Sequence, residues 1–144
     1  MTDVTDTVMA GADDLLAEAG ALLEDVVALR RDIHRRPELG LDLPVTQARV
    51  LEALAGLPLR VATGVRQSSI VADLDGERPG PTVLLRADMD ALPMPEDTGL
   101  DFASEDAGVM HSCGHDAHTA MLVGAARLLA GRRGELAGRV PFLF

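Results

Sequence analysis

Residues 111–118, which read HSCGHDAH, constrain this chain more than any other stretch. They hold the only cysteine, Cys113, and three of the four histidines. Thiolate and neutral imidazole are the ligands that zinc and its neighbours prefer, and Gly114 lets the backbone turn tightly between two donors. The cluster therefore predicts part of a metal site. The alternative is structural, since a free cysteine is usually a small core hydrophobe and a single histidine a satisfied polar residue.

This cluster is predicted to follow a loop over residues 93–110 and to lead into a helix. Asp116 is expected to be the N-cap of that helix and Gly131 its C-terminal stop. Cys113 and His115 then lie on the loop that enters the helix, which is a rigid base for a site. The predicted apolar face of the helix consists of Ala117, Met121, Leu122, Ala125, Leu128 and Leu129.

A second acidic stretch follows a predicted strand. Residues 82–85, TVLL, are expected to form a strand buried on both faces. The strand runs into Asp88 and Asp90, and open α/β sheets place their sites at such strand ends. The two aspartates would face the same side if the strand continued. They are either solvated carboxylates in a turn, or they serve as a metal ligand or as a carboxylate that orients a ligand histidine.

Two further helices are predicted before this strand. An apolar stripe starts at Ala12, acidic residues come early and arginines late, and Pro37 ends the helix. His34, near the end of this helix, is expected to be a partly exposed helix-end residue. A shorter helix is predicted over residues 45–55, and Gly56 ends it.

The remaining apolar runs predict strands. Residues 59–63 and 69–74 are strand-like, and the turn over residues 75–80 indicates a hairpin connection to the next strand. A last strand is expected over residues 139–144. Pro141 removes one backbone donor there, so this strand is predicted to lie at a sheet edge or to be strained.

Composition limits the function further. The 144 residues are 47% hydrophobic, which is enough for one domain with a core, and with three Phe and no Trp or Tyr that core must be aliphatic. A net charge of −10 argues against nucleic-acid binding. A single cysteine cannot form an internal disulfide, and neither a signal peptide nor an apolar run of membrane-spanning length is evident. We expect a soluble, cytoplasmic protein.

Three separated motifs resemble the M20 family of metallopeptidases. They are residues 29–40 (LRRDIHRRPELG), 86–94 (RADMDALPM) and 111–119 (HSCGHDAHT). They are most similar to the amidohydrolase branch, which includes hippurate hydrolase and the N-acyl-amino-acid and auxin-conjugate amidohydrolases. The resemblance implies an α/β fold: the N-terminal portion of a mixed-sheet catalytic domain flanked by helices, over residues 11–144, after a flexible N-terminus over residues 1–10.

The resemblance also implies a two-metal site. Cys113 and His115 would be metal ligands, and Asp90 would be the catalytic-site aspartate that orients and polarises a ligand. Whether Asp88, Asp116 and His118 support the ligands from behind is left open. The ions would be two divalent cations of Zn, Mn, Co or Ni, and the substrate an N-acyl amino acid or a short peptide-like molecule. The resemblance implies no membrane partner. A homo-oligomer is one option for the full-length form.

The family motif that follows the last predicted strand is a pair of glutamates, one of which is the general base. The chain stops at Phe144, before that motif, and the family's lid domain and the rest of the sheet would come later. We therefore predict an amidohydrolase fragment that is inactive on its own. Two alternatives remain: a non-catalytic metal-binding or interaction module, and a Cys113 nucleophile with His115 or His118 as its base.

Overall fold

The computed structural model describes residues 14–144. The predicted flexible N-terminus over residues 1–10 and the predicted helix start at Ala12 lie outside the described residues. A helical stretch over residues 14–21 precedes the first named element. The elements that follow are α2 (Leu23–Arg35), α3 (Pro44–Leu54), β1 (Arg60–Thr63), β2 (Ile70–Asp75), β3 (Arg78–Thr82), β4 (Leu85–Arg86), α4 (His115–Gly131), the 3-10 helix η1 (Arg133–Glu135) and β5 (Ala137–Leu143).

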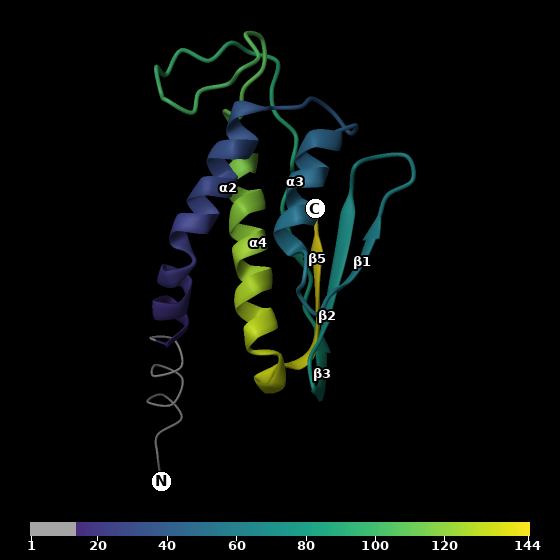
Figure 1. The fold of residues 1–144 in the computed structure, drawn as a ribbon. Coiled ribbons are helices and arrows are strands. Elements are labelled where there is room, and N and C mark those ends of the chain that lie inside the picture. Colours follow the sequence, from purple (N-terminus) through teal and green to yellow (C-terminus); the bar gives the residue numbers. More distant parts are fainter. Residues whose placement is uncertain (1–13) are drawn as a thin grey trace.

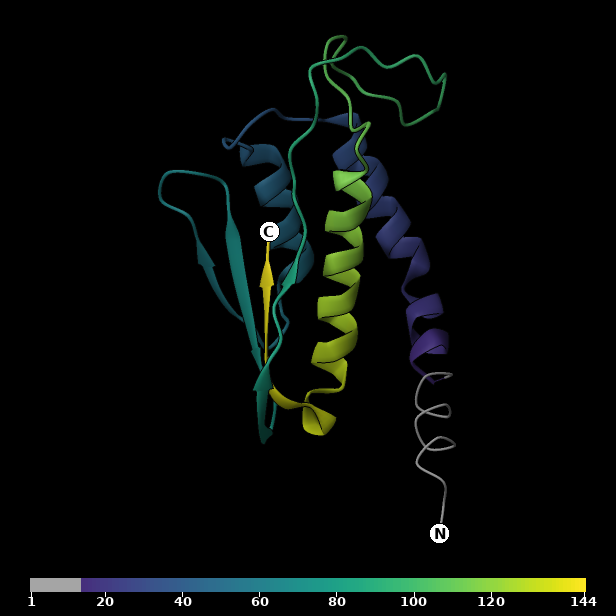
Figure 2. The ribbon, with the colours of Figure 1, turned by 180° about the vertical axis from the view of Figure 1, so that it is seen from behind.

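The strands form a five-stranded mixed sheet in the order β1-β2-β5-β3, with β4 also paired to β5. β1 with β2 and β2 with β5 are antiparallel, whereas β3 and β4 run parallel to β5. The helices lie together on one side of the sheet, as Figure 1 and the reverse view in Figure 2 show. This arrangement confirms the predicted α/β fold with a mixed sheet and flanking helices.

The predicted hairpin at residues 75–80 is wrong, because β5 lies between β2 and β3. The turn pairs with the start of β5 instead: the Gly76 N–H donates to the Gly138 carbonyl at 2.8 Å. Close approach is possible because neither residue carries a Cβ, and Gly138 has a φ of 90°. A chain reversal that looks local in the sequence is therefore completed by a distant strand.

β5 is a central strand, so of the two alternatives predicted for Pro141, the edge position is wrong. Register places Thr82 beside Arg139 and Leu85 beside Phe142, and the interruption between β3 and β4 falls between these pairs. Pro141, which has no N–H to donate, lies opposite that interruption. The predicted buried strand over residues 82–85 is accordingly broken, and Val83 and Leu84 are 52% and 56% exposed.

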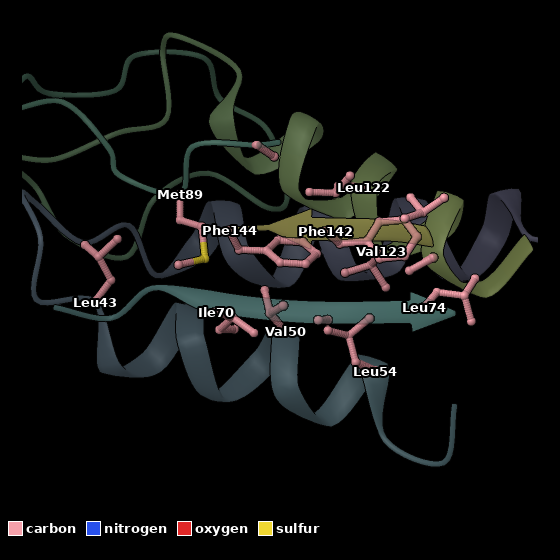
Figure 3. Packing of buried hydrophobic residues seen from close by; sticks show 14 residues of the cluster. Leu43, Val50, Leu54, Ile70, Leu74, Met89, Leu122, Val123, Phe142 and Phe144 are labelled. Carbon is pink, nitrogen blue, oxygen red and sulfur yellow. The ribbon is translucent and has the colours of Figure 1, made fainter. Parts of the chain in front are cut away.

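One face of the sheet carries the core. Burial alternates along β2, where Ile70, Ala72 and Leu74 are buried and the residues between them are half-buried. Phe142 of β5 is fully buried against this face, and Figure 3 shows it among side chains from α3 and α4. The core is mainly aliphatic, as predicted, but phenylalanine is part of it: Phe142 and Phe144 belong to the same cluster.

The predicted helices occur, with changes at their ends. The first is broken at Leu22, and of the residues in α2 only Ile33 and His34 are buried. The rest of its predicted apolar stripe is therefore half-buried or exposed, with Leu23 58% exposed. α3 begins at Pro44, one residue before the predicted start, and ends at Leu54. In residues 14–144 no helix is both long and apolar enough to cross a membrane.

Candidate metal centre

A long loop connects β4 to α4. It brings the acidic stretch with Asp88 and Asp90 close to the donor-rich stretch over residues 111–118. Leu92 and Met110 form an isolated antiparallel bridge, with N–H to carbonyl distances of 2.9 and 3.0 Å. This bridge pins the base of the intervening loop, which projects beyond the ends of the helices in Figure 1. The residues on either side of the bridge, Asp90 and His115, consequently meet.

Asp90 holds the imidazole of His115. The His115 Nδ1 lies 2.9 Å from the Asp90 backbone oxygen and 2.9 Å from its Oδ1. Because both of these atoms accept hydrogen bonds, Nδ1 carries a proton, and in the neutral imidazole the lone pair is then on Nε2. A carboxylate that fixes a histidine in this tautomer is the usual partner of a metal-ligating imidazole.

Cys113 lies two residues before His115 and is exposed. Gly114, between them, has a φ of 82° and is the N-cap residue of α4. The left-handed conformation is open to glycine at little cost, so the glycine produces the sharp turn between the two donors. Asp116 is therefore not the N-cap that the sequence predicted. It lies inside the first turn of the helix, whereas the predicted stop at Gly131 is confirmed as the last residue of α4.

Asp116 faces away from solvent and toward α2. It is fully buried, and its Oδ2 lies 2.6 Å from the Arg30 Nε and 2.7 Å from the His34 Nδ1. The other ring nitrogen of His34 lies 3.2 Å from the Glu96 Oε1. His34 is only 3% exposed, so the prediction of a partly exposed helix-end residue is wrong.

His111 is buried beside this group. Its ring lies 6.1 Å from that of His34, and neither of its ring nitrogens has a hydrogen-bond partner among the described residues. Burial lowers the pKa of His111; the Asp116 carboxylate opposes that effect, and the nearby His34 adds to it. His111 is thus a neutral, buried member of the cluster that the sequence grouped with the metal donors.

Asp88 and His118 stand apart from the Asp90–His115 pair. The Asp88 carboxylate is paired with Arg86, and the Asp88 carbonyl accepts a hydrogen bond from the Thr119 Oγ1 at 3.0 Å. His118 is exposed, and its ring lies 6.3 Å from that of His115. A cavity of about 330 Å³ adjoins this region, and Asp88 and Asp90 contribute to its wall.

Sequence reasoning missed Arg30 and Glu96 and gave His34 no role. Arg30 and His34 are four residues apart on a helix, which places them on one face and was the available signal. Glu96 sits in a loop with several other acidic residues, and nothing in its neighbourhood marks it. Its contact with His34 spans 62 positions of the sequence, so only the fold reveals it.

The donor chemistry fits one side of a metal centre. Cys113 supplies an exposed thiol, and His115 presents a free Nε2 that Asp90 orients. In residues 14–144 no group of three His, Cys, Asp or Glu side chains converges in a way that could hold an ion. Cys113 and His115 can therefore contribute to a coordination shell, and the described residues do not complete one.

Comparisons with known proteins relate the chain to one family. Residues 84–144 match the family model described as peptidase family M20/M25/M40. An N-acyl-L-amino acid amidohydrolase of Geobacillus stearothermophilus is 43% identical over 120 residues, which are 83% of this chain and 32% of that protein. An N-acetyl-L-cysteine deacetylase of Bacillus subtilis is 41% identical over 85% of this chain and 30% of its own length.

Solved structures of similar proteins share the fold of this chain. A putative aminohydrolase from methicillin-resistant Staphylococcus aureus superimposes with a TM-score of 0.86 at 38% identity, covering 91% of this chain and 34% of that one. A dinuclear metal-binding peptidase of Bacillus subtilis gives a TM-score of 0.81 at 39% identity, covering 87% and 35%. The chain thus spans about a third of the length of the proteins it matches.

Proposed function

Because the chain belongs to peptidase family M20, we propose that it forms part of the catalytic domain of a metal-dependent amidohydrolase. The proposed reaction is hydrolysis of the amide bond of an N-acyl amino acid or a similar conjugate. The relatives named for N-acyl-L-amino acid amidohydrolase and N-acetyl-L-cysteine deacetylase activity support this substrate class. The strongly negative net charge of −10 also favours a site that binds cations over one that binds polyanions.

The observation that carries the proposal is the pair formed by Asp90 and His115. A histidine whose Nδ1 is held at 2.9 Å by a carboxylate presents one lone pair in a fixed direction. Cys113 lies in the same segment, two residues before His115 at the start of α4, and its thiol is exposed to solvent. Two donors of the types that zinc and neighbouring metals prefer thus lie together at the N-terminal end of α4.

In this proposal Cys113 and His115 would hold metal, and Asp90 would act on His115 from behind. Two divalent ions, when bound, would supply the concentrated positive charge that polarises an amide carbonyl and acidifies water. Asp90 would keep the proton on the His115 Nδ1 and so keep Nε2 available as a donor. The buried pairing of Asp116 with Arg30 would fix the helix turn that carries His115.

Cobalt titration of the 144-residue chain tests the proposal. A thiolate-to-Co²⁺ charge-transfer band is expected in the wild type, because Cys113 would bind as the thiolate. Cys113→Ser should abolish the band. Asp90→Ala should keep it but weaken Co²⁺ affinity by roughly 10–100-fold, which is the usual effect of removing a partner that orients a ligand histidine.

Ser112→Ala is the matched control, because Ser112 is the exposed neighbour of Cys113 and bonds only to the Met94 sulfur among the described residues. It should titrate like the wild type. A wild-type chain that shows no thiolate band at any Co²⁺ concentration would contradict the proposal. Hydrolysis of N-acetyl amino acids by this chain is expected to stay at background even with added Mn²⁺ or Zn²⁺, because two donors bind metal weakly.

A cysteine nucleophile is the second candidate, and the Asp90–His115 pair gives it some support. A base that is oriented by a carboxylate is also what a Cys-His-Asp arrangement needs. No hydrogen bond joins Cys113 to His115 or His118 in the described part of the chain. Alkylation of Cys113 by iodoacetamide separates the two candidates. A nucleophile activated by His115 would react fast and lose that rate in His115→Ala, whereas a metal ligand would be protected by added Zn²⁺.

A further inference from the structure

We propose that His34 is a positioning residue for the metal-binding loop, and that it acts as a doubly protonated imidazolium joining the first turn of α4 to the loop over residues 93–110. This inference rests on the proposed function, because it concerns the support of the same two donors, Cys113 and His115. Neither donor touches His34. Its influence would pass through Asp116, which directly follows His115.

His34 bridges two segments that flank the candidate metal centre. It belongs to α2, its side chain is 4% exposed, and its two ring nitrogens point to different parts of the chain. Nδ1 lies 2.7 Å from the Oδ2 of Asp116 on α4, and Nε2 lies 3.2 Å from the Oε1 of Glu96 in the loop. One planar ring thus joins three segments that are distant in the sequence.

The contacts of Glu96 require a proton on the His34 Nε2. The Thr98 hydroxyl donates to the Glu96 Oε1 at 2.5 Å and the Ser104 N–H donates to its Oε2 at 2.6 Å. Burial opposes ionisation of Glu96, but these two donors act against it and help to hold the pKa of Glu96 well below its usual value. The Glu96 carboxylate is therefore ionised at neutral pH and can only accept hydrogen bonds. A bare imidazole nitrogen at this position would face a carboxylate oxygen, which is repulsive.

The contacts of Asp116 require a proton on the His34 Nδ1 as well. Asp116 is fully buried, and its Oδ2 already pairs with the guanidinium of Arg30 at 2.6 Å. An oxygen in this ion pair is an acceptor and offers no hydrogen to His34. A neutral imidazole has only one N–H, so it could satisfy either Asp116 or Glu96, whereas an imidazolium donates to both.

The surroundings of His34 balance such a charge. The groups that face it are Arg30 of α2, Asp116 of α4, Glu96 and Phe102 of the loop, and His111, which directly follows the loop. Two carboxylates thus meet one guanidinium and one imidazolium. This balance is what a buried ionic group needs, because an unpaired charge there would be strongly destabilising.

Loss of His34 would release the turn that carries His115. Asp116 would keep only Arg30, and its Oδ1 has no partner among the described residues. The loop would stay attached to α2 by other contacts. The guanidinium carbons of Arg30 and Arg31 lie 5.0 and 4.9 Å from the centre of the Phe102 ring, and the Glu105 N–H donates to the Arg35 carbonyl at 2.8 Å. The expected defect is therefore local: the first turn of α4 shifts against Asp90.

Long-range proton–nitrogen NMR of the ¹⁵N-labelled, metal-free chain reports which ring nitrogens of His34 and His115 carry a proton. In the wild type at neutral pH, His34 should show two protonated ring nitrogens, and His115 should show the single tautomer with the proton on Nδ1. In His34→Gln the His115 signals should move to an average of the two tautomers. A neutral His34 in the wild type, or an unchanged His115 tautomer in His34→Gln, would overturn the proposal.

Ile33→Val is the matched control, because Ile33 is the buried neighbour of His34 on the same helix and takes no part in the polar group. It should leave the His115 tautomer unchanged. If His34→Gln fails to fold, Glu96→Gln supplies the answer, because it keeps the shape of the side chain and removes its charge. His34 should then show only one protonated ring nitrogen in the same NMR experiment at neutral pH, and continued double protonation would contradict the proposal.

Co²⁺ affinity provides a second readout. His34→Gln should bind Co²⁺ roughly tenfold more weakly than the wild type and Ile33→Val should not, because partners behind the ligands typically act on affinity by such factors. Equal affinity in all three proteins would argue against the inference. The absence of a thiolate–Co²⁺ band in the wild type would instead count against the proposed function, and the NMR result would still decide the role of His34.

Discussion

Glu96 is a buried carboxylate whose ionised form is built into the fold. Its side chain is 3% exposed, and it accepts hydrogen bonds from the Thr98 hydroxyl at 2.5 Å and the Ser104 N–H at 2.6 Å. These donors and His34 favour the charged form more strongly than burial disfavours it, so the pKa lies near 2 instead of 4.5. Protonation of Glu96 therefore costs the folded state more than the unfolded chain.

This linkage predicts a pH dependence of stability. A group whose pKa is lowered on folding stabilises the protein fully above its unfolded pKa and loses that contribution as pH falls toward the folded pKa. The contribution of Glu96 should thus be lost between about pH 4.5 and about pH 2. Glu96→Gln should destabilise the chain by roughly 1–3 kcal/mol at pH 7. It should also flatten this acid limb, as measured by urea denaturation at a series of pH values.

A control for the acid limb is Glu105→Gln, whose carboxylate is 61% exposed and pairs with Arg36 at 3.6 Å. An exposed pair of this kind contributes little, so the pH profile should keep the shape of the wild type. If Glu96→Gln and wild type lose stability in parallel below pH 4.5, the described hydrogen bonds do not hold the carboxylate ionised.

At this scale the sequence indicated the Asp90–His115 contact, but it did not indicate the buried residues around Asp116. The position of Asp90 after a strand, facing a donor-rich loop, was enough to place it near His115. The exposure of His34 was misjudged because its partner, Asp116, lies 82 residues away. Local patterns report which face of a helix a residue occupies, and they carry no information on which distant carboxylate fills that face.

At the scale of elements, α3 begins with a cap that comes from another segment. Its N-cap residue, Leu43, makes no side-chain hydrogen bond. Glu38 supplies the missing acceptors instead: its carboxylate accepts from the N–H groups of Val45 and Thr46 at 3.1 and 2.7 Å, and from the Thr46 hydroxyl at 2.8 Å. A negative charge at a helix N-terminus is also favoured by the helix dipole.

Glu38→Ala is expected to destabilise the chain by about 1 kcal/mol, which is the usual effect of removing a helix N-cap. Glu52→Ala is the matched control, because Glu52 lies on the same helix, is 76% exposed and makes only a 3.5 Å pair with Arg49. It should change stability by less than about 0.5 kcal/mol. Thermal melts followed by circular dichroism measure both, and equal effects would show that Glu38 does not cap α3.

Elements were predictable where the signal is local. Gly56, with a φ of 80°, is such a signal, and α3 ends at Leu54, just before it. The pairing of strands was not predictable in this way. The insertion of β5 beside β2 depends on contacts across more than 60 residues, as between Asp73 and Pro141. Turn residues alone therefore suggested a hairpin that does not form.

At the scale of the whole molecule, the edge of the sheet at β3 is protected along only part of its length. β3 reads RPGPT, and its prolines withhold the N–H groups that an added strand would need. The protection ends at Val83 and Leu84, which are 52% and 56% exposed between β3 and β4. This short apolar segment is the part of the edge most open to another chain.

We predict that the 144-residue chain self-associates through this segment. Val83→Lys combined with Leu84→Lys should shift it toward monomer in size-exclusion chromatography with light scattering, because charge on an edge opposes strand addition. Val65→Lys is the control: Val65 is fully exposed in the turn after β1, and its replacement should not change the distribution. A wild type that is monodisperse at high concentration would contradict the prediction.

The central place of β5 has a consequence for synthesis on the ribosome. β2 can pair with β1 as soon as both have emerged, but its other edge and β3 both need β5, which comes more than 50 residues after β3. The sheet cannot be completed until that strand leaves the exit tunnel, so one edge of β2 and the whole of β3 keep unpaired backbone groups until then. A nascent chain arrested before residue 137 should therefore remain sensitive to protease. Resistance should arise in one step once β5 is exposed, since pairings between distant segments form late.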